Sequence, residues 1–101
     1  MRILAIERPV PGVADDRFTP ELSAAEARQA WELHQAGSIR ELFFRADEAA
    51  AVLALECGDL DEARRVLATL PMVATGLIDF ELIPLRAYPG FGRLFAASAG
   101  S

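Results

Sequence analysis

Apolar and polar residues alternate or cluster in four stretches of the chain, and in two longer stretches the apolar residues recur at helical spacing. The first kind of pattern predicts strands at residues 2–8, 38–45, 51–57 and 77–85. The second predicts one helix beginning after Thr19 and reaching about Ala36, and another at residues 60–70. The predicted order is therefore strand, helix, strand, strand, helix, strand.

Capping residues mark the ends of both predicted helices. Thr19, followed by a proline, is a typical helix start, and Gly37 is a typical C-terminal stop. Asp59 and Glu62 form the acidic version of a capping box, and Pro71 ends the second helix. These local signals agree with the hydrophobic pattern.

The element order predicts an α+β fold of the ferredoxin-like βαββαβ type, with a four-stranded antiparallel sheet and two helices on one face. The turn at residues 46–48 is too short for a crossover, so the second and third strands form a hairpin. With 101 residues there is room for one domain, with a core at about residues 1–86 and a tail at 87–101.

Composition indicates that a second copy covers the other face of the sheet. The chain is 52% hydrophobic, which is high for this length, and the tail adds Tyr88, Phe91 and Phe95 after the last strand. We expect a homodimer or a higher oligomer in which two sheets form a dimeric α/β barrel. The aromatic tail would then pack on the partner chain or over a pocket.

Charge and cysteine usage limit the class of partner and the compartment. A net charge of −5 with scattered arginines argues against nucleic acid or an anionic membrane as partner. The single cysteine, Cys57, lies in a predicted buried strand and fits a reducing compartment. No apolar run approaches the roughly 20 residues of a membrane span, so a cytoplasmic protein is expected.

Glu26 is the first candidate for chemistry. It lies in the inward-facing stripe of the first helix with Leu22, Ala30 and Leu33, and partial loss of water raises the pKa of such a carboxyl group. A raised pKa suits a group that accepts and returns a proton near neutral pH. The alternative is structural: Glu26 is the last residue of a Ser23-x-x-Glu26 capping box.

The first strand and the loop after it offer no candidate for chemistry. Strand parity places Glu7 on the same face as Ile3 and Ala5. Asp15 and Asp16 occupy a surface loop that can border a cleft, although an acidic pair in a loop is more often simply solvated.

Two arginines lie at the ends of the second strand. Parity divides that strand into two faces, Arg40, Leu42 and Phe44 on one and Ile39, Glu41, Phe43 and Arg45 on the other. Either arginine can hold a carboxylate with two hydrogen bonds, or it can form a salt bridge to Glu41, Asp47 or another acid. Arg40 is the stronger candidate, and Phe44 and Arg45 are candidates for substrate contact.

His34 and Trp31 are the remaining candidates for substrate contact. His34 is the only histidine and lies near the end of the first helix, where a cation is favoured by the helix dipole; an ordinary surface histidine is the alternative. Trp31 is a packing anchor or a pocket wall. The sequence contains no metal-ligand spacing, phosphate-binding loop or Ser/His/Asp order, so we expect neither a metal nor a cofactor.

Three segments give the chain a resemblance to the muconolactone delta-isomerase family. Residues 37–45, Gly-Ser-Ile-Arg-Glu-Leu-Phe-Phe-Arg, are similar to the second strand of that family. Leu70-Pro71-Met72 with the strand at 78–85 resembles its Leu-Pro-Leu turn and last strand, and residues 86–89 resemble its Arg-x-x-Pro exit. The resemblance covers about residues 26–89, and ungapped alignment from Gly37 places the helix acid of the family on Glu26.

The resemblance implies a cofactor-free isomerase that moves a proton within a small unsaturated lactone or a related carboxylate. Glu26 would carry the proton, and Arg40 would hold the substrate carboxylate or the developing enolate oxygen. Residues 46–50 replace an aromatic, histidine-bearing segment of the family, so the resemblance does not name the substrate.

Two other functions fit the same barrel. One is a non-catalytic module for ligand binding or assembly, favoured if Trp31 or Phe91 fills the cleft beside Glu26. The other is a cofactor-free monooxygenase of aromatic polyketides, which oxygen uptake would reveal.

Overall fold

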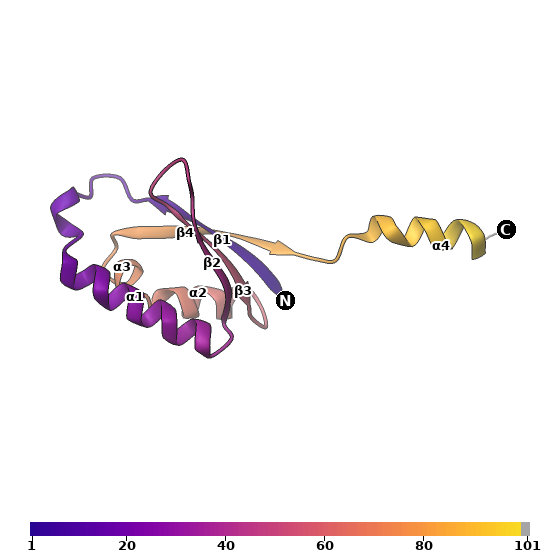
Figure 1. Cartoon of the computed structure of the whole chain (residues 1–101), viewed down its shortest axis with the longest axis horizontal. Helices are drawn as coiled ribbons and strands as arrows, with labels where there is room; N and C mark the ends of the chain where they lie inside the picture. Colours follow the sequence, from indigo (N-terminus) through magenta and orange to yellow (C-terminus); the bar gives the residue numbers. More distant parts are fainter. Residues whose placement is uncertain (100–101) are drawn as a thin grey trace.

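The predicted elements form in the predicted order, with additional short helices between and after them (Figure 1). The computed structural model describes residues 1–99, so the last two residues of the predicted tail lie outside it. The elements are β1 Arg2–Pro9, η1 Asp15–Arg17, α1 Pro20–Gln35, β2 Ile39–Phe44, β3 Ala51–Glu56, α2 Leu60–Ala68, α3 Pro71–Ala74, β4 Ile78–Leu85, η2 Pro89–Phe91 and α4 Gly92–Ala99. Within residues 1–99, no helix combines the length and the apolar character needed to cross a bilayer.

The four strands form one antiparallel sheet in the order β2-β3-β1-β4. Helices α1, α2 and α3 lie on the same side of this sheet (Figure 1). Strands β2 and β3 form the expected hairpin, and β1 lies between β3 and β4. The α+β ferredoxin-like prediction is confirmed.

Helix caps form where the sequence placed them. The Thr19 side chain accepts a hydrogen bond from the Leu22 N–H at 3.1 Å, and the Asp59 side chain accepts one from the Glu62 N–H at 2.7 Å. The Glu62 carboxylate in turn accepts from the N–H of Gly58, one residue before the cap, and not from the Asp59 N–H of a standard capping box. Pro71 does more than was predicted, because it is the first residue of the short helix α3.

The core lies between the sheet and the helices. Ile3 and Ala5 of β1 and Leu55 of β3 are fully buried on the helix-covered face, and helix α2 contributes the buried Ala63 and Leu67. The predicted inward stripe of α1 is correct, since its four members are half-buried while most of their helix neighbours are exposed. This packing leaves room beneath the first half of α1 for the pocket described below.

The predicted division of β2 into two faces is wrong because the strand contains a bulge. Ile39 pairs with Leu55 and Glu41 pairs with Ala54, so Arg40 is an extra residue between two pairs. The extra residue shifts the parity: the buried Ile39 shares its face with Leu42. Strand alternation alone does not reveal such a shift.

The other face of the sheet has no cover within the described chain. Leu4 and Ile6 of β1 are half-buried there and neighbour Val52, Ala54 and Ile83 in the strand register. Ion pairs border this apolar centre: Arg8 with Glu81 at 2.7 Å, and Arg2 with Glu56 at 3.3 Å. We call this surface, made of Leu4, Ile6, Val52, Ala54 and Ile83 with its ion pairs, the open face.

The C-terminal arm, residues 86–99, extends away from the body and ends in α4 (Figure 1). The molecule measures 65 × 28 × 22 Å, and its radius of gyration is 17.4 Å, compared with about 13 Å for a compact chain of this length. The side chains of Tyr88, Phe91, Leu94 and Phe95 are exposed on the arm. Apolar side chains on an isolated arm favour contact with another chain.

Candidate active site

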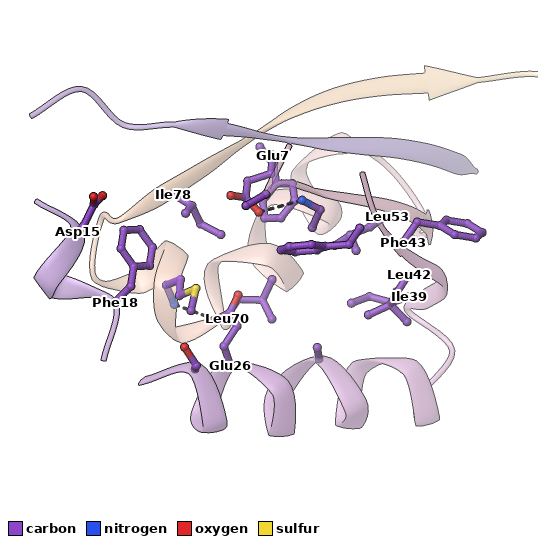
Figure 2. A pocket seen from close by; sticks show the side chains of 17 residues that line it. Glu7, Asp15, Phe18, Glu26, Ile39, Leu42, Phe43, Leu53, Leu70 and Ile78 are labelled. Atoms are coloured by element: carbon purple, nitrogen blue, oxygen red, sulfur yellow. Dashed lines mark hydrogen bonds between the residues drawn. The ribbon is translucent and has the colours of Figure 1, made fainter. Parts of the chain in front are cut away.

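A partly open cavity of about 720 Å³ lies between α1 and the helix-covered face of the sheet (Figure 2). We call it the central pocket. This volume is within the range of small-molecule sites. Most of its wall is apolar, and its lining residues are Glu7, Asp15, Phe18, Ser23, Glu26, Ala30, Ile39, Leu42, Phe43, Phe44, Ala49, Ala51, Leu53, Leu70, Met72, Ile78 and Phe80.

Glu26 projects from α1 into the central pocket (Figure 2). It does not form the predicted capping box, because the Ser23 N–H donates to the Thr19 carbonyl within the helix at 3.0 Å. Instead a Glu26 oxygen accepts a hydrogen bond from the Met72 N–H at 2.9 Å, near the start of α3. Burial raises the pKa of Glu26 above 4.5, this hydrogen bond lowers it, and the charge on Glu7 raises it further, with an upward net shift.

Glu7 is a second carboxylate of the central pocket, and the sequence did not single it out. It extends from β1 on the face of Ile3 and Ala5, opposite the helix that carries Glu26 (Figure 2). One of its oxygens accepts a hydrogen bond from the Ala51 N–H at 3.0 Å. The parity of β1 was the available signal: an acid that continues a buried apolar face has to find either a partner or a cavity.

Aromatic residues form part of the pocket wall. Four phenylalanines line the central pocket: Phe18, Phe43, Phe44 and Phe80. Phe44, predicted as a substrate contact, is among them and is 69% exposed, which places it at the rim. Asp15, expected in a loop that borders a cleft, also belongs to the lining. A flat, apolar molecule with few polar groups fits such a wall.

The two arginine candidates lie outside the central pocket. Arg40 is exposed at the bulge and is not among the lining residues. Arg45 is bound by its own hairpin, at 2.6 Å from an Asp47 oxygen and 2.5 Å from a Glu48 oxygen. This is the salt-bridge alternative anticipated for Arg45, and the arginine hydrogen bonds lower the pKa of Asp47.

Trp31 and His34 also lie outside the central pocket. Trp31 is 63% exposed, and its ring centroid lies 6.2 Å from that of His34, which is exposed on the same helix. Neither residue lines the cavity within this chain, so their contact with substrate stays a prediction. Of the six predicted site residues, the structure brings Glu26 and Phe44 together.

The donors in the central pocket suit proton transfer better than metal binding. Across residues 1–99, no three histidine, cysteine, aspartate or glutamate side chains gather closely enough to hold a metal ion. Glu26 has a raised pKa and lies on an apolar wall, which are the usual properties of a general acid or base. The arrangement can therefore accept a proton from a bound molecule and return it.

Comparison with known proteins assigns the chain to a family. The family model described as muconolactone delta-isomerase matches residues 4–90. The chain belongs to the muconolactone delta-isomerase family. The match begins within β1 and continues past the end of β4, and both carboxylates, Glu7 and Glu26, lie within it. No curated protein sequence matches the chain closely enough to count as a relative.

Two solved structures share the fold of this family member. A crystal structure of muconolactone isomerase is 22% identical, with a TM-score of 0.69, and the match covers 88% of this chain and 92% of the other. A 5-chloro-2-hydroxyhydroquinone dehydrochlorinase from Burkholderia phenoliruptrix, in complex with 2,5-dihydroxybenzoquinone, is 17% identical, with a TM-score of 0.64 and coverage of 89% and 98%. At these identities the similarity establishes the fold and not the reaction.

Proposed function

We propose that this protein is a cofactor-independent isomerase that moves a proton within a small unsaturated lactone. The observation that carries the proposal is the position of Glu26: a half-buried carboxyl with a raised pKa, on the wall of an apolar pocket of suitable volume. Membership of the muconolactone delta-isomerase family favours this reaction over other uses of the fold.

The proposed reaction needs one group that acts first as a base and then as an acid. The Glu26 carboxylate removes a proton from a carbon that the conjugated carbonyl makes acidic, and the electron pair of that C–H bond moves into the conjugated system. The protonated Glu26 then returns the proton to a different carbon, which shifts the double bond. No oxidant or reductant is consumed.

A non-catalytic binding module is the second candidate, and one observation favours it. The hydrogen bond from the Met72 N–H gives Glu26 a structural explanation, because the carboxylate then caps α3. Against this candidate, neither Trp31 nor Phe91 fills the central pocket. The dehydrochlorinase among the solved structures, in complex with 2,5-dihydroxybenzoquinone, shows that a protein of this fold can bind a cyclic unsaturated ligand, which is compatible with either candidate.

Solvent exchange tests the isomerase directly. Muconolactone and its methyl ester are incubated with enzyme in D₂O, and proton NMR follows deuterium incorporation at carbon. We expect Glu26→Gln to lower the exchange rate by about 10²–10⁴-fold, because glutamine cannot accept the proton. Its amide oxygen can still accept the Met72 hydrogen bond.

Glu32→Gln is the matched control, since Glu32 is exposed on the same helix, and it should exchange at the wild-type rate. Equal rates in Glu26→Gln and wild type would remove Glu26 from the mechanism. Oxygen uptake with candidate phenols would instead identify a monooxygenase.

We also propose that the chain acts as a homodimer or a higher oligomer. The open face and the exposed side chains of the C-terminal arm are the surfaces that a second copy would cover. The arm is then an extension of a single domain that packs on the partner. Light scattering on the full chain should give a mass of at least two chains, and a chain ending at Arg86 should lose part of this association. A monomeric full chain would contradict the proposal.

A further inference from the structure

Glu7 is the feature of the central pocket that the proposed proton transfer does not use. Glu7 is half-buried, and it continues a strand face whose other positions, Ile3 and Ala5, are fully buried and apolar. A carboxylate at the end of such a face needs a polar partner or a cavity. The pairing of β1 with β3 ends at Ile6 and Val52, and the Glu7 carboxylate takes the next N–H, that of Ala51. The hydrogen bond holds one carboxylate oxygen in place. The other oxygen has no hydrogen-bond partner among the described residues.

The charged groups of the central pocket all have one sign. Its ionisable lining residues are Glu7, Asp15 and Glu26, and no arginine, lysine or histidine of the described chain lines it. The two arginines predicted to bind a ligand carboxylate lie outside the pocket. Arg45 is held by Asp47 and Glu48, and Arg40 is exposed at the bulge. A ligand carboxylate would therefore meet only negative charge, within apolar walls that screen it less than water does.

Glu7 acts electrostatically on Glu26 across the pocket. The charge on Glu7 contributes to the raised pKa of Glu26. A ligand carboxylate would add another negative charge and raise the pKa of Glu26 further. Glu26 would then stay protonated when the reaction requires a base. A cationic ligand would have the opposite effect, holding Glu26 ionised when it has to carry the proton.

We propose that the central pocket prefers uncharged unsaturated rings, such as a lactone or a quinone-like ring, over the same rings with an ionised carboxyl group, and that Glu7 sets this preference. This inference rests on the proposed function only in taking the central pocket as the substrate site. It changes the expected substrate class, since the sequence suggested a carboxylate held by Arg40. Glu7 acts on specificity by repelling an anion, and Glu26 performs the proton transfer.

Muconolactone and its methyl ester provide the test, because they share one skeleton and differ in one negative charge at neutral pH. Calorimetric titration of the full chain in its natural assembly should show the ester binding at least about tenfold more tightly than the free acid. Glu7→Gln should reduce this ratio about tenfold by tightening binding of the acid, with ester affinity nearly unchanged. Glu32→Gln should leave the ratio at its wild-type value.

Ionic strength gives a second measurement that needs no variant. For the wild type, added salt should tighten binding of the acid and should have little effect on the ester, since screening weakens repulsion. Equal affinities for acid and ester in the wild type would overturn the inference, as would a Glu7→Gln variant that folds and keeps the wild-type ratio.

The outcomes separate this inference from the proposed isomerase. Selective binding of the ester without deuterium exchange in any ligand would support the preference for uncharged rings and would refute the isomerase. Rapid Glu26-dependent exchange in the free acid, with affinity equal to that of the ester, would support the isomerase and would refute the preference.

Discussion

The two faces of the sheet treat acidic side chains in opposite ways. On the open face, the glutamates at 41, 56 and 81 each lie within 4.0 Å of an arginine nitrogen. On the helix-covered face, Glu7 and Glu26 line an apolar pocket in which the described chain supplies no cation. Paired surface charges serve solubility and contribute little to stability, whereas unpaired acids in a cavity cost stability and are typical of functional sites.

The largest expected loss of stability comes from placing a carboxylate in the core, on the helix-covered face of the sheet. Leu55→Asp puts an unpaired charge at a fully buried position, and the loss should exceed about 4 kcal/mol. Because a domain of this size has a stability of about 5–15 kcal/mol, circular dichroism should show an unfolded or strongly destabilised chain. A variant with native-like urea unfolding would mean that this face is not the core.

A leucine-to-aspartate substitution on the open face should disrupt assembly without disrupting the fold. Leu4 lies between Ala54 and Ile83 near the centre of that face. Leu4→Asp should therefore preserve the circular dichroism spectrum of the wild type while abolishing self-association in light scattering. An unchanged oligomer would show that the open face is not the interface, and it would leave the C-terminal arm as the remaining candidate surface.

The burial of Glu26 should make the free energy of unfolding depend on pH. The pKa of Glu26 is raised in the folded chain, so the folded state holds its proton more tightly than the unfolded state does. The free energy of unfolding should therefore fall as pH rises from about 4.5 through the folded pKa, and this cost should be absent below 4.5.

Glu26→Gln removes this titration and isolates its effect. Urea unfolding at about pH 4 and about pH 7 should show the variant gaining stability relative to the wild type as pH rises. The burial of Glu26 would be contradicted if the difference in free energy of unfolding between variant and wild type did not depend on pH, or if it changed in the opposite direction.

The smallest effect should come from an ion pair of the open face. Arg8 and Glu81 are both about half exposed, so Arg8→Ala should cost about 0.2–1 kcal/mol, and less at high salt. Urea unfolding at two ionic strengths measures this cost. A loss of several kcal/mol would mean that the partner chain covers the ion pairs at the border of the open face as well as its apolar centre.

Sequence reasoning predicted the fold well because each element has a local signature. The stripe of α1, the caps at Thr19 and Asp59 and the short hairpin turn each constrain the topology without reference to distant residues. The short helix α3 and the C-terminal helix α4 were not predicted. Pro71 was interpreted only as a helix end, although proline is also favoured at the first position of a helix.

The candidate site was predicted only in part, because it depends on contacts between distant segments. Glu26 was found from its stripe, but its partner, the Met72 N–H, lies 46 residues away. The bulge at Arg40 depends on how β2 pairs with β3, which alternation within one strand does not determine. Glu7 was assigned to the correct face, but the cavity beside it exists only once α1 and α3 are in place.

Titration of the Glu26 carboxyl carbon by NMR tests the central claim most directly. The account predicts a pKa above 4.5 in the wild type and a lower value in Glu7→Gln, because that substitution removes a neighbouring negative charge from the pocket. A pKa at or below 4.5 that does not respond to Glu7→Gln would show that Glu26 is an ordinary solvated or capping carboxylate, and the proposed proton transfer would lose its basis.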